Sequence, residues 1–215
     1  MNIAFLHTAA VHVETFNGLL DQLGYQGTRT HKVMPELLDQ ARQHGLDHVR
    51  ARVEAVLAEL ATADAVMCTC STLGPVADVV SQTYDHVFRI DRPVMEKASD
   101  FGPDIMVAIC LESTQAATLD LLHACADREE KAVSPRVVLC AHAWPHFERG
   151  DFEGFADSIA STITTEVAAS ARPDCVLLAQ ASMRVAETRL ADLGIPVFSS
   201  PRLAAERAIR IAASR

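Results

Sequence analysis

Short apolar runs alternate along this chain with longer segments in which apolar residues recur every three or four positions. The short runs predict strands at residues 3–6, 65–69, 86–90, 105–110, 137–141, 175–179 and 196–198, and the polar residues 28–33 are a candidate for an eighth. The periodic segments predict helices at residues 13–23, 35–60 with an interruption at Gly45, 73–80, 92–99, 113–126, 152–170, 182–193 and 203–213. Strands that are apolar throughout and alternate with helices indicate an α/β fold, with parallel sheets covered on both faces.

The eight predicted strands fall into two sets of four, which favours two similar lobes over one large sheet. Residues 64–72 and 174–182 align without a gap: each has an Asp, an apolar strand and then small polar residues where a helix begins. Any two strand–helix units share part of this pattern, so the alignment by itself leaves an internal repeat open. We expect two flavodoxin-like lobes, one formed by residues 1–95 and 200–215 and the other by residues 96–199.

Composition and charge restrict the classes of function. The chain has 215 residues, 49% of them hydrophobic, and a formal net charge of −9. An acidic chain with scattered basic residues makes a poor nucleic-acid binder, because phosphate binding needs a basic face. No apolar run is long enough to span a bilayer, and the first residues are typical of a strand and not of a signal peptide. We therefore expect a cytoplasmic protein whose six cysteines are thiols.

Candidate chemistry gathers where predicted strands end, which is where ligands bind in parallel α/β sheets. Cys70 follows one strand and precedes a helix, where free backbone N–H groups and the helix dipole lower the pKa of a thiol. Gln180 has the equivalent place in the second half. The other residues expected to contact a ligand are Thr8, Ser71, Thr72, Ser113, Thr114, Ala181 and Ser182. The hydroxyls among them are also typical helix caps, so capping and binding both remain open.

Residues 63–72, Ala-Asp-Ala-Val-Met-Cys-Thr-Cys-Ser-Thr, resemble the Asp, apolar strand and Cys-Asn-Thr/Ser motif of the aspartate/glutamate racemase superfamily. Residues 178–183, Leu-Ala-Gln-Ala-Ser-Met, look like the Leu-Gly-Cys-Ala-Gly-Met motif of its hydantoin racemases. The family also includes maleate isomerases and arylmalonate decarboxylases. The resemblance implies two lobes related by a pseudo-twofold axis, an active site between them, no cofactor and a homodimer. In the racemases, two thiols face opposite sides of the substrate α-carbon.

The chain departs from this pattern at Gln180, which stands where the racemases have their second cysteine. An amide cannot act as a base near neutral pH. We expect a cofactor-independent isomerase or racemase acting on a small carboxylate, such as an amino acid or a derivative of one, with Cys70 and Gln180 as its catalytic residues. A decarboxylase or other lyase that uses one thiol is the alternative enzyme, and a non-catalytic protein that binds small carboxylates is the alternative from another class.

Residues 141–148, Ala-His-Ala-Trp-Pro-His-Phe-Glu, follow a predicted strand and hold the only tryptophan. Two histidines and a glutamate could ligate a metal, but no third convergent ligand is evident, so we expect a mobile loop over the site and no metal. His31, His44 and His48 are expected at the surface. Cys68 and the remaining cysteines are expected to be core residues.

Overall fold

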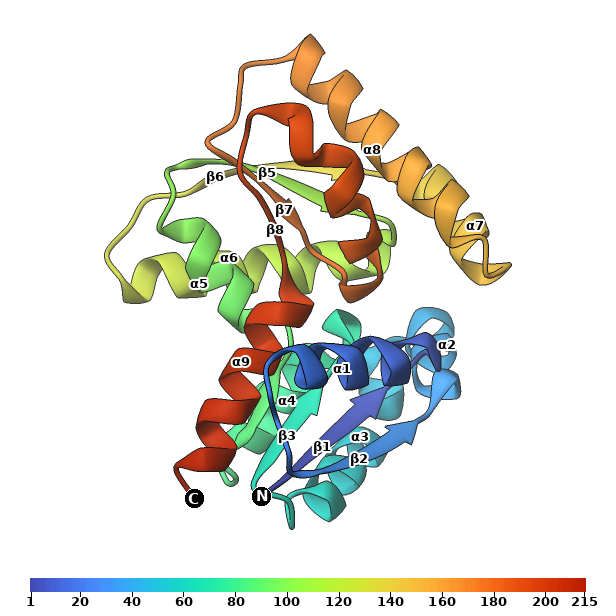
Figure 1. Cartoon of the computed structure of the whole chain (residues 1–215), viewed down its shortest axis with the longest axis vertical. Helices are drawn as coiled ribbons and strands as arrows, with labels where there is room; N and C mark the ends of the chain where they lie inside the picture. Colours follow the sequence, from blue (N-terminus) through green and yellow to red (C-terminus); the bar gives the residue numbers. More distant parts are fainter. The chain divides into compact units, whose positions relative to one another are not determined.

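The computed structural model describes residues 1–215 and divides them into two compact lobes. The first comprises Met1–Asp91 with Pro201–Arg215, and the second comprises Arg92–Ser200. Each lobe holds one four-stranded parallel sheet, so the prediction of two sheets in place of one is confirmed (Figure 1). The chain passes from the first lobe to the second after Asp91, whereas we expected this boundary after residue 95. The reason is that α5 (Arg92–Ser99) belongs to the second lobe.

The sheet of the first lobe has the strand order β2-β1-β3-β4. Its strands are β1 (Asn2–His7), β2 (Thr28–Val33), β3 (Ala65–Cys68) and β4 (Val87–Arg89). Its helices are α1 (Val11–Gln22), α2 (Pro35–His44), α3 (Leu46–Leu60), the short 3₁₀ turn η1 (Ser71–Leu73), α4 (Gly74–Ser81) and α9 (Ser200–Ala213). Figure 1 shows α1 and α9 on one face of this sheet, with α2, α3 and α4 on the other.

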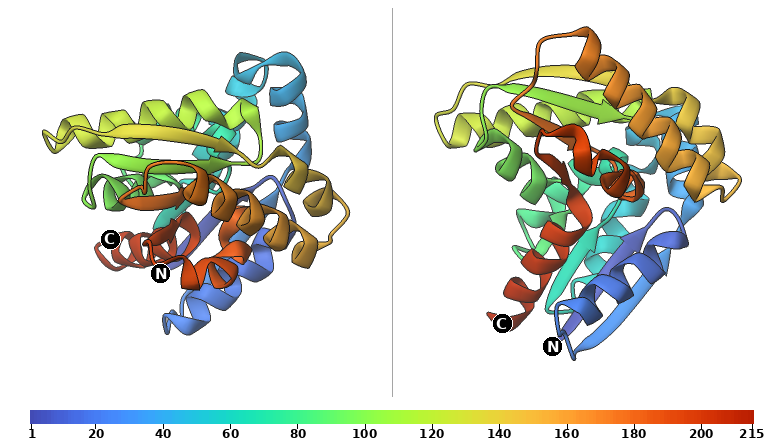
Figure 2. Two further views of the ribbon diagram at one scale, coloured as in Figure 1. Left: turned by 90° about the horizontal axis from the view of Figure 1, so that it is seen from above. Right: turned by 45° about the horizontal axis from the view of Figure 1, so that its top comes forward.

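The sheet of the second lobe has the corresponding order β6-β5-β7-β8. Its strands are β5 (Asp104–Ile109), β6 (Ser134–Leu139), β7 (Cys175–Leu178) and β8 (Val197–Ser199). Its helical segments are α5 (Arg92–Ser99), η2 (Glu112–Thr114), α6 (Gln115–Arg128), η3 (Ala141–Ala143), α7 (Trp144–Glu148), α8 (Phe152–Ala169) and η4 (Ala181–Leu193). Helices α5 and α6 cover one face of the sheet and α8 runs along the other (Figures 1 and 2).

Two details of the second lobe differ from the prediction. Strand β6 begins at Ser134 and not at residue 137, because it pairs with β5 along its whole length. It is an edge strand, where Pro135 can lie without depriving a neighbour of a hydrogen bond. The segment expected to be a helix over residues 182–193 is helical, but of the 3₁₀ type, and it ends at Gly194 with a left-handed backbone, φ 67°.

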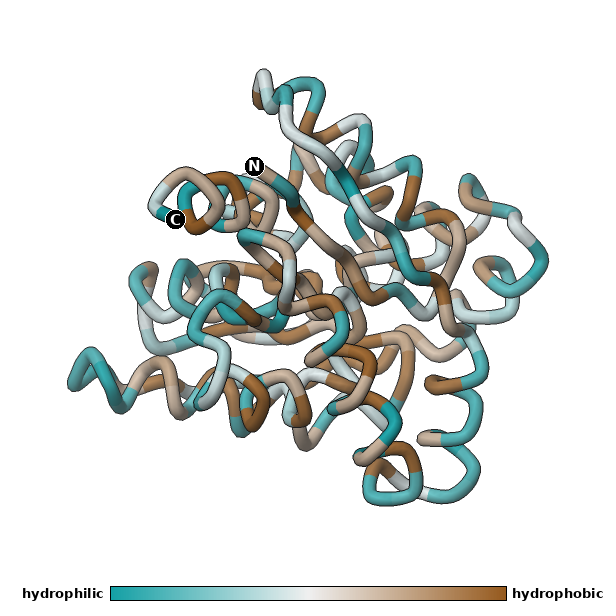
Figure 3. Tube along the Cα trace, turned by 90° about the horizontal axis from the view of Figure 1, so that it is seen from below, coloured by the Kyte–Doolittle hydropathy of each residue, from teal (hydrophilic) through white to brown (hydrophobic).

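The apolar strands β1, β3, β5 and β7 are buried on both faces, which explains why they lack the alternation of a half-exposed strand, whereas the edge strands β2 and β6 are partly exposed. On one face of the first sheet, β1 and β3 pack against α2, α3 and α4; on the other face, Phe5 meets Phe16 of α1 with ring centroids 5.1 Å apart. In the second lobe, β5, β6 and β7 pack against α8 and η4. Figure 3 shows these apolar strands bordered by helices of mixed polarity. None of the helices has both the length and the apolar character needed to cross a membrane.

The two aligned segments found in the sequence have the same local structure in both lobes. Asp64 Oδ2 accepts a hydrogen bond from the N–H of Asn2 at 2.6 Å, and Asp174 Oδ2 accepts one from the N–H of Asp104 at 3.0 Å. In each lobe the aspartate thus ties the start of one strand to the start of its neighbour. The alignment therefore reflects repeated local structure and goes beyond a shared composition.

A buried ion pair supports the segment that follows β3. The Arg89 guanidinium contacts both carboxylate oxygens of Asp91, Nε to Oδ1 at 2.6 Å and Nη2 to Oδ2 at 2.8 Å, and its Nη1 reaches Asp78 Oδ2 at 2.9 Å. Both Arg89 and Asp91 are buried. A Cβ at Gly74 would lie 2.5 Å from Arg89 Cζ, so only glycine lets the start of α4 approach the guanidinium this closely.

Candidate active site

Cys70 lies just past the carboxyl end of β3, in an extended conformation with φ −112° and ψ 116°. Its carbonyl accepts a hydrogen bond from the N–H of Leu73 at 3.1 Å, which closes the turn of η1. Gln180 occupies the matching place after β7, with φ −109°, ψ 141° and a hydrogen bond from the N–H of Met183 to its carbonyl at 3.0 Å. The two residues thus hold equivalent positions, each within its own lobe.

The pKa of the Cys70 thiol is raised by burial, although several groups act against this effect. A hydrogen bond from the Thr8 side chain and the backbone N–H groups of Leu73 and Thr72 favour the thiolate. The sequence-based expectation of a lowered pKa is therefore wrong. The reason is that η1 has three residues and little dipole to offer, while desolvation of the charged form is strong. The resting sulfur is a thiol, surrounded by groups that can stabilise the anion.

The first lobe brings three of the expected site residues together at this strand end. Thr8, which is 9% exposed, contacts the Cys70 sulfur. The buried hydroxyl of Thr72 finds no hydrogen-bond partner in the resting protein, although it lies near enough to Cys70 to favour the thiolate. A buried hydroxyl without a partner is costly unless a ligand satisfies it. Ser71, between them in the chain, is also buried.

The side chain of Gln180 is held by the backbone of the second lobe. Its Oε1 accepts hydrogen bonds from the N–H groups of Cys110 at 2.5 Å and Leu111 at 3.1 Å, just past the end of β5. Because the carbonyl oxygen is occupied, the side chain can offer a ligand only the N–H bonds of its NH₂ group. Gln180 is therefore built as a hydrogen-bond donor and not as a base.

The other expected residues of the second lobe lie around these same turns. The Thr114 hydroxyl donates to the carbonyl of Leu111 at 2.7 Å and is buried, so it stabilises the turn that leads into α6. Ser113 is exposed, Ala181 is buried and Ser182 is partly buried. Thr114 and Gln180 thus share a neighbour in Leu111, whereas Ser113 faces solvent.

The remaining cysteines are free, buried thiols. Burial raises the pKa of Cys68 to about 12, and the pKa of Cys140 and of Cys175 to about 11. Cys68 belongs to the core cluster of the first lobe, and Cys110 and Cys140 belong to that of the second. The expectation that these residues pack in the core is confirmed.

Residues 141–148 form η3 and the short helix α7, so the prediction of a loop is wrong. The segment is fixed by packing, because Trp144 stacks on Phe147 at 4.8 Å and its Nε1 donates to Glu148 Oε1 at 2.8 Å. His146 pairs with Asp151 at 2.7 Å. No group of three or more His, Cys, Asp and Glu side chains lies in a position to hold a metal ion.

The sequence analysis missed a buried histidine cluster beside Cys70. His31 lies on the edge strand β2 and is half-buried, so it is less exposed than expected, and its Nδ1 contacts His7 Nε2 at 2.8 Å. The physical reason is that β1 and β2 are adjacent parallel strands, which brings these two side chains to one face. The signal in the sequence was the spacing of Phe5 and His7, which places both side chains on the same side of β1.

We expect the protein to lose stability as the pH falls below about 6.5. Burial lowers the pKa of His7 to about 3 and that of His12 to about 4, so the unfolded chain binds more protons than the folded protein between these values and 6.5. The loss is at most about 1.4 kcal/mol per pH unit for each histidine. Urea denaturation of the wild type and of His12→Leu from pH 7.5 to 4.5 measures it. A His12→Leu profile as steep as that of the wild type would contradict the assignment, and the exposed His44 provides a control as His44→Leu.

No protein-family model matches this sequence, and no curated protein matches it. Solved structures match its fold over almost the whole chain. An aspartate racemase from Picrophilus torridus superposes with a TM-score of 0.73 at 13% identity, covering 99% of this chain and 94% of that one. A glutamate racemase from Bacillus anthracis has a TM-score of 0.71 at 14% identity, with 99% and 81% covered. An arylmalonate decarboxylase has a TM-score of 0.61 at 17% identity, with 99% and 94% covered.

These matches define the class of fold. Each lobe is a four-stranded parallel sheet between helices, and the chain has the two-lobe α/β fold of the aspartate and glutamate racemases. Several other racemase structures match equally well in coverage, among them a putative Asp/Glu racemase from Yersinia pestis with a TM-score of 0.67. The resemblance inferred from residues 63–72 and 178–183 is confirmed at the level of the fold.

Proposed function

We propose that this protein is a cofactor-independent enzyme of the isomerase and racemase type, acting on a small carboxylate such as an amino acid or an amino-acid derivative. Cys70 is its proton-transfer group. The observation that carries the proposal is the setting of Cys70: a thiol at a strand end, with the Thr8 side chain and two backbone N–H groups directed at its sulfur. Cys70 belongs to the core cluster of the first lobe, but four hydrogen-bonding interactions favour its anion, against one for Cys68 and one for Cys140.

The proposed mechanism follows from the two protonation states of this thiol. As a thiol, Cys70 can give a proton to a carbanion or enediolate carbon, and the resulting thiolate is stabilised by the Thr8 side chain and the N–H groups of η1. As a thiolate, it can remove the proton beside the substrate carboxylate. The unpartnered Thr72 hydroxyl offers a hydrogen bond to a carboxylate oxygen and would gain the partner that it lacks.

Gln180 has a different role in this proposal. Its NH₂ group donates a hydrogen bond to a carboxylate or enediolate oxygen, while its Oε1 stays on the backbone N–H groups of Cys110 and Leu111. Since it cannot take up a proton, a reaction that needs a second base is disfavoured. With Cys70 as the single thiol of the proposed site, proton transfer takes place on one face of the substrate.

A second candidate, a one-thiol decarboxylase, is favoured by the raised pKa of Cys70. Loss of CO₂ from a malonate-type substrate leaves an enediolate that needs an acid and no base. A sulfur that rests as a thiol is already in the required form. In this reaction, the proton from Cys70 goes to the carbon that carried the lost carboxyl group, and solvent then restores the thiol.

Incubation of the protein in deuterated water with amino acids, hydantoins and malonates tests the proposal and separates these functions. An isomerase or racemase incorporates deuterium at the carbon beside the carboxylate and releases no CO₂. A decarboxylase releases CO₂ and gives a deuterium-labelled product of a single handedness. Binding of a carboxylate, seen as protection of Cys70 from iodoacetamide, with no deuterium or CO₂ from any substrate, would instead indicate a non-catalytic binding protein.

We expect Gln180→Cys to add proton exchange that the wild type lacks. The residue stands where the hydantoin racemase motif has its second cysteine, so the substitution restores a thiol at that position. A substrate that the wild type labels with one handedness should then yield both. Chiral chromatography of the deuterated product measures this. Gln180→Ser, which is small but cannot exchange protons near neutral pH, is the matched control; equal racemisation in both variants would contradict the prediction.

A further inference from the structure

Side chains continue the pairing of β1 with β3 beyond the end of the backbone ladder. The last ladder pair is Leu6 opposite Cys68, and the next residues in register are His7 and Thr69. The imidazole Nδ1 of His7 lies 2.8 Å from the Thr69 hydroxyl, and both residues are buried. Past this pair the backbone supplies one more bond, from the Thr69 N–H to the Leu6 carbonyl at 3.0 Å, and the side-chain hydrogen bond between His7 and Thr69 adds a second connection at the same step.

The catalytic thiol lies one step further along the same register. Thr8 follows His7, and Cys70 follows Thr69, so the hydrogen bond from the Thr8 side chain to Cys70 is the next contact between the same two segments. The strands alone do not hold this contact, because it lies outside the ladder. Two side-chain connections next to it keep the segments at a fixed separation: the bond between His7 and Thr69, and the bond from the Thr69 hydroxyl to the Leu6 carbonyl.

The direction of each hydrogen bond in this chain can be deduced from the number of protons available. The Thr69 hydroxyl donates its one proton to the carbonyl of Leu6 at 3.1 Å, so it must accept from His7 Nδ1. His7 is then a neutral imidazole whose Nε2 carries a lone pair, and it accepts from His31 Nδ1 at 2.8 Å. His31 and His7 thus both donate in the direction of Thr69, whose hydroxyl donates back to Leu6 of β1. Protonation of His7 would put two N–H groups against each other, which agrees with its lowered pKa.

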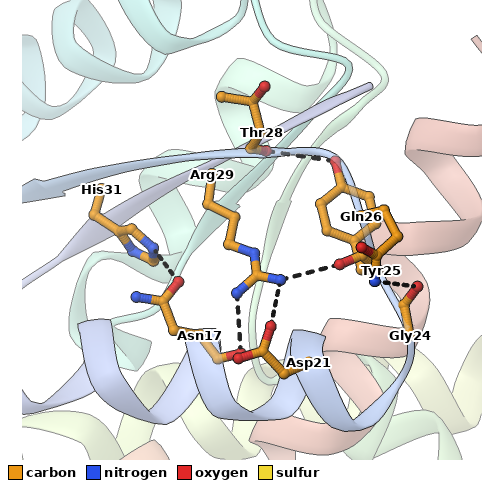
Figure 4. Close-up of polar contacts among 8 residues, drawn as sticks. All are labelled: Asn17, Asp21, Gly24, Tyr25, Gln26, Thr28, Arg29 and His31. Atoms are coloured by element: carbon orange, nitrogen blue, oxygen red, sulfur yellow. Dashed lines mark hydrogen bonds and ion pairs between the residues drawn. The ribbon is translucent and has the colours of Figure 1, made fainter.

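The outer end of this hydrogen-bonded chain, at His31, is held by Asn17 of α1. Figure 4 shows the His31 ring directed at the side-chain amide of Asn17, with Nε2 and Oδ1 3.2 Å apart. The charged and titratable groups that face this part of the chain are His12 beside His7, and Arg29 and Glu14 near His31. The amide of Asn17 can accept from a protonated His31 or, when turned, donate to a neutral one, so the inner bonds persist in both states.

Aromatic packing prevents the His7 ring from turning away from Thr69. Its centroid lies 5.4 Å from that of Phe5, 5.9 Å from Phe16 and 5.1 Å from His31, and the side chain is fully buried. A ring that is packed on several sides and bonded at both nitrogen atoms has a single orientation. The position of Thr69 is fixed along with it.

We propose that His7 is a positioning residue for Cys70. The chain from His31 through His7 to Thr69 holds the residue before the thiol, and so keeps the Cys70 sulfur against the Thr8 side chain that stabilises its anion. The consequence for catalysis rests on the proposed function of Cys70. The effect on the thiol itself does not, because it is present in the free protein.

The test measures the pKa of Cys70 in the free protein, from the pH dependence of iodoacetamide alkylation of the peptide that contains it, read by mass spectrometry. In His7→Phe the ring packing remains but the bond to Thr69 is lost. We expect the pKa to rise by about one unit, and alkylation at a fixed pH below it to slow about tenfold. In His7→Asn the amide N–H₂ stands near the place of Nδ1, and we expect most of the wild-type profile to return.

Thr69→Val and Thr69→Ser provide the same comparison from the other side, and they keep the experiment decisive if His7→Phe does not fold. Valine keeps the shape but removes both the acceptor for His7 and the donor to the Leu6 carbonyl, so the shift should be at least as large as in His7→Phe, while serine should behave as the wild type. His44→Phe, at an exposed site, is the control. An unchanged alkylation profile in folded Thr69→Val or His7→Phe would overturn the proposal. Retained turnover in Cys70→Ser would overturn the proposed function and leave this result intact.

Discussion

Replacing Cys70 with serine should lower turnover by about 10²–10⁴-fold while leaving the fold intact. The hydroxyl keeps nearly the same shape and can still bond with the Thr8 side chain. It titrates far above the pKa of a thiol, so it neither gives up nor takes a proton at a useful rate. The loss is measured as deuterium incorporation into whichever amino acid, hydantoin or malonate proves to be a substrate, and urea denaturation measures stability.

The matched control is Cys68→Ser, two residues earlier in the chain. Its sulfur is fully buried in the core cluster and donates to the carbonyl of Cys70 at 3.8 Å. We expect this variant to lose stability and to keep catalytic activity in the fraction that remains folded. Full activity in Cys70→Ser would locate the chemistry elsewhere and reduce the likeness to the racemases to one of fold.

Removal of the Asp91 carboxylate should destabilise the protein by about 3–5 kcal/mol, because it leaves the buried Arg89 charge without its main partner. The side chain of Asp91 is 0% exposed and that of Arg89 is 3% exposed, so water cannot take over the role of the carboxylate. Against a total stability of about 5–15 kcal/mol, a loss of this size is severe. Urea denaturation of Asp91→Ala measures it directly.

The control for this prediction is Asp85→Ala. Asp85 pairs with Arg215 at 2.6 Å, but its side chain is 89% exposed, and an ion pair surrounded by water adds little to stability. If both variants lost the same small amount, the buried pair would not support the fold as we describe. Since Gly74 lies against Arg89, we also expect Asp91→Ala to loosen the turn from Cys70 into α4.

The pattern of apolar residues determined most of the architecture. Strands such as 65–69 and 175–179 are apolar throughout, and only a sheet covered on both faces buries both sides of such a strand. Pairing of strands into two sets of four, the repeated aspartates Asp64 and Asp174, and the positions of Cys70 and Gln180 after their strands followed from that pattern. These features depend on local sequence and on the period of the backbone, which is why they could be read in advance.

The tertiary structure decided the features that depend on which segments become neighbours. His31 looked like a surface residue in the sequence, and only the pairing of β1 with β2 places it against His7. The pKa of Cys70 was expected to be low from its place before a helix, but desolvation by its surroundings raises it. The orientation of Gln180 likewise depends on the backbone N–H groups past β5, about 70 residues earlier in the chain. The burial of a residue and its contacts with distant segments depend on the whole folded chain, so a local sequence pattern cannot predict them.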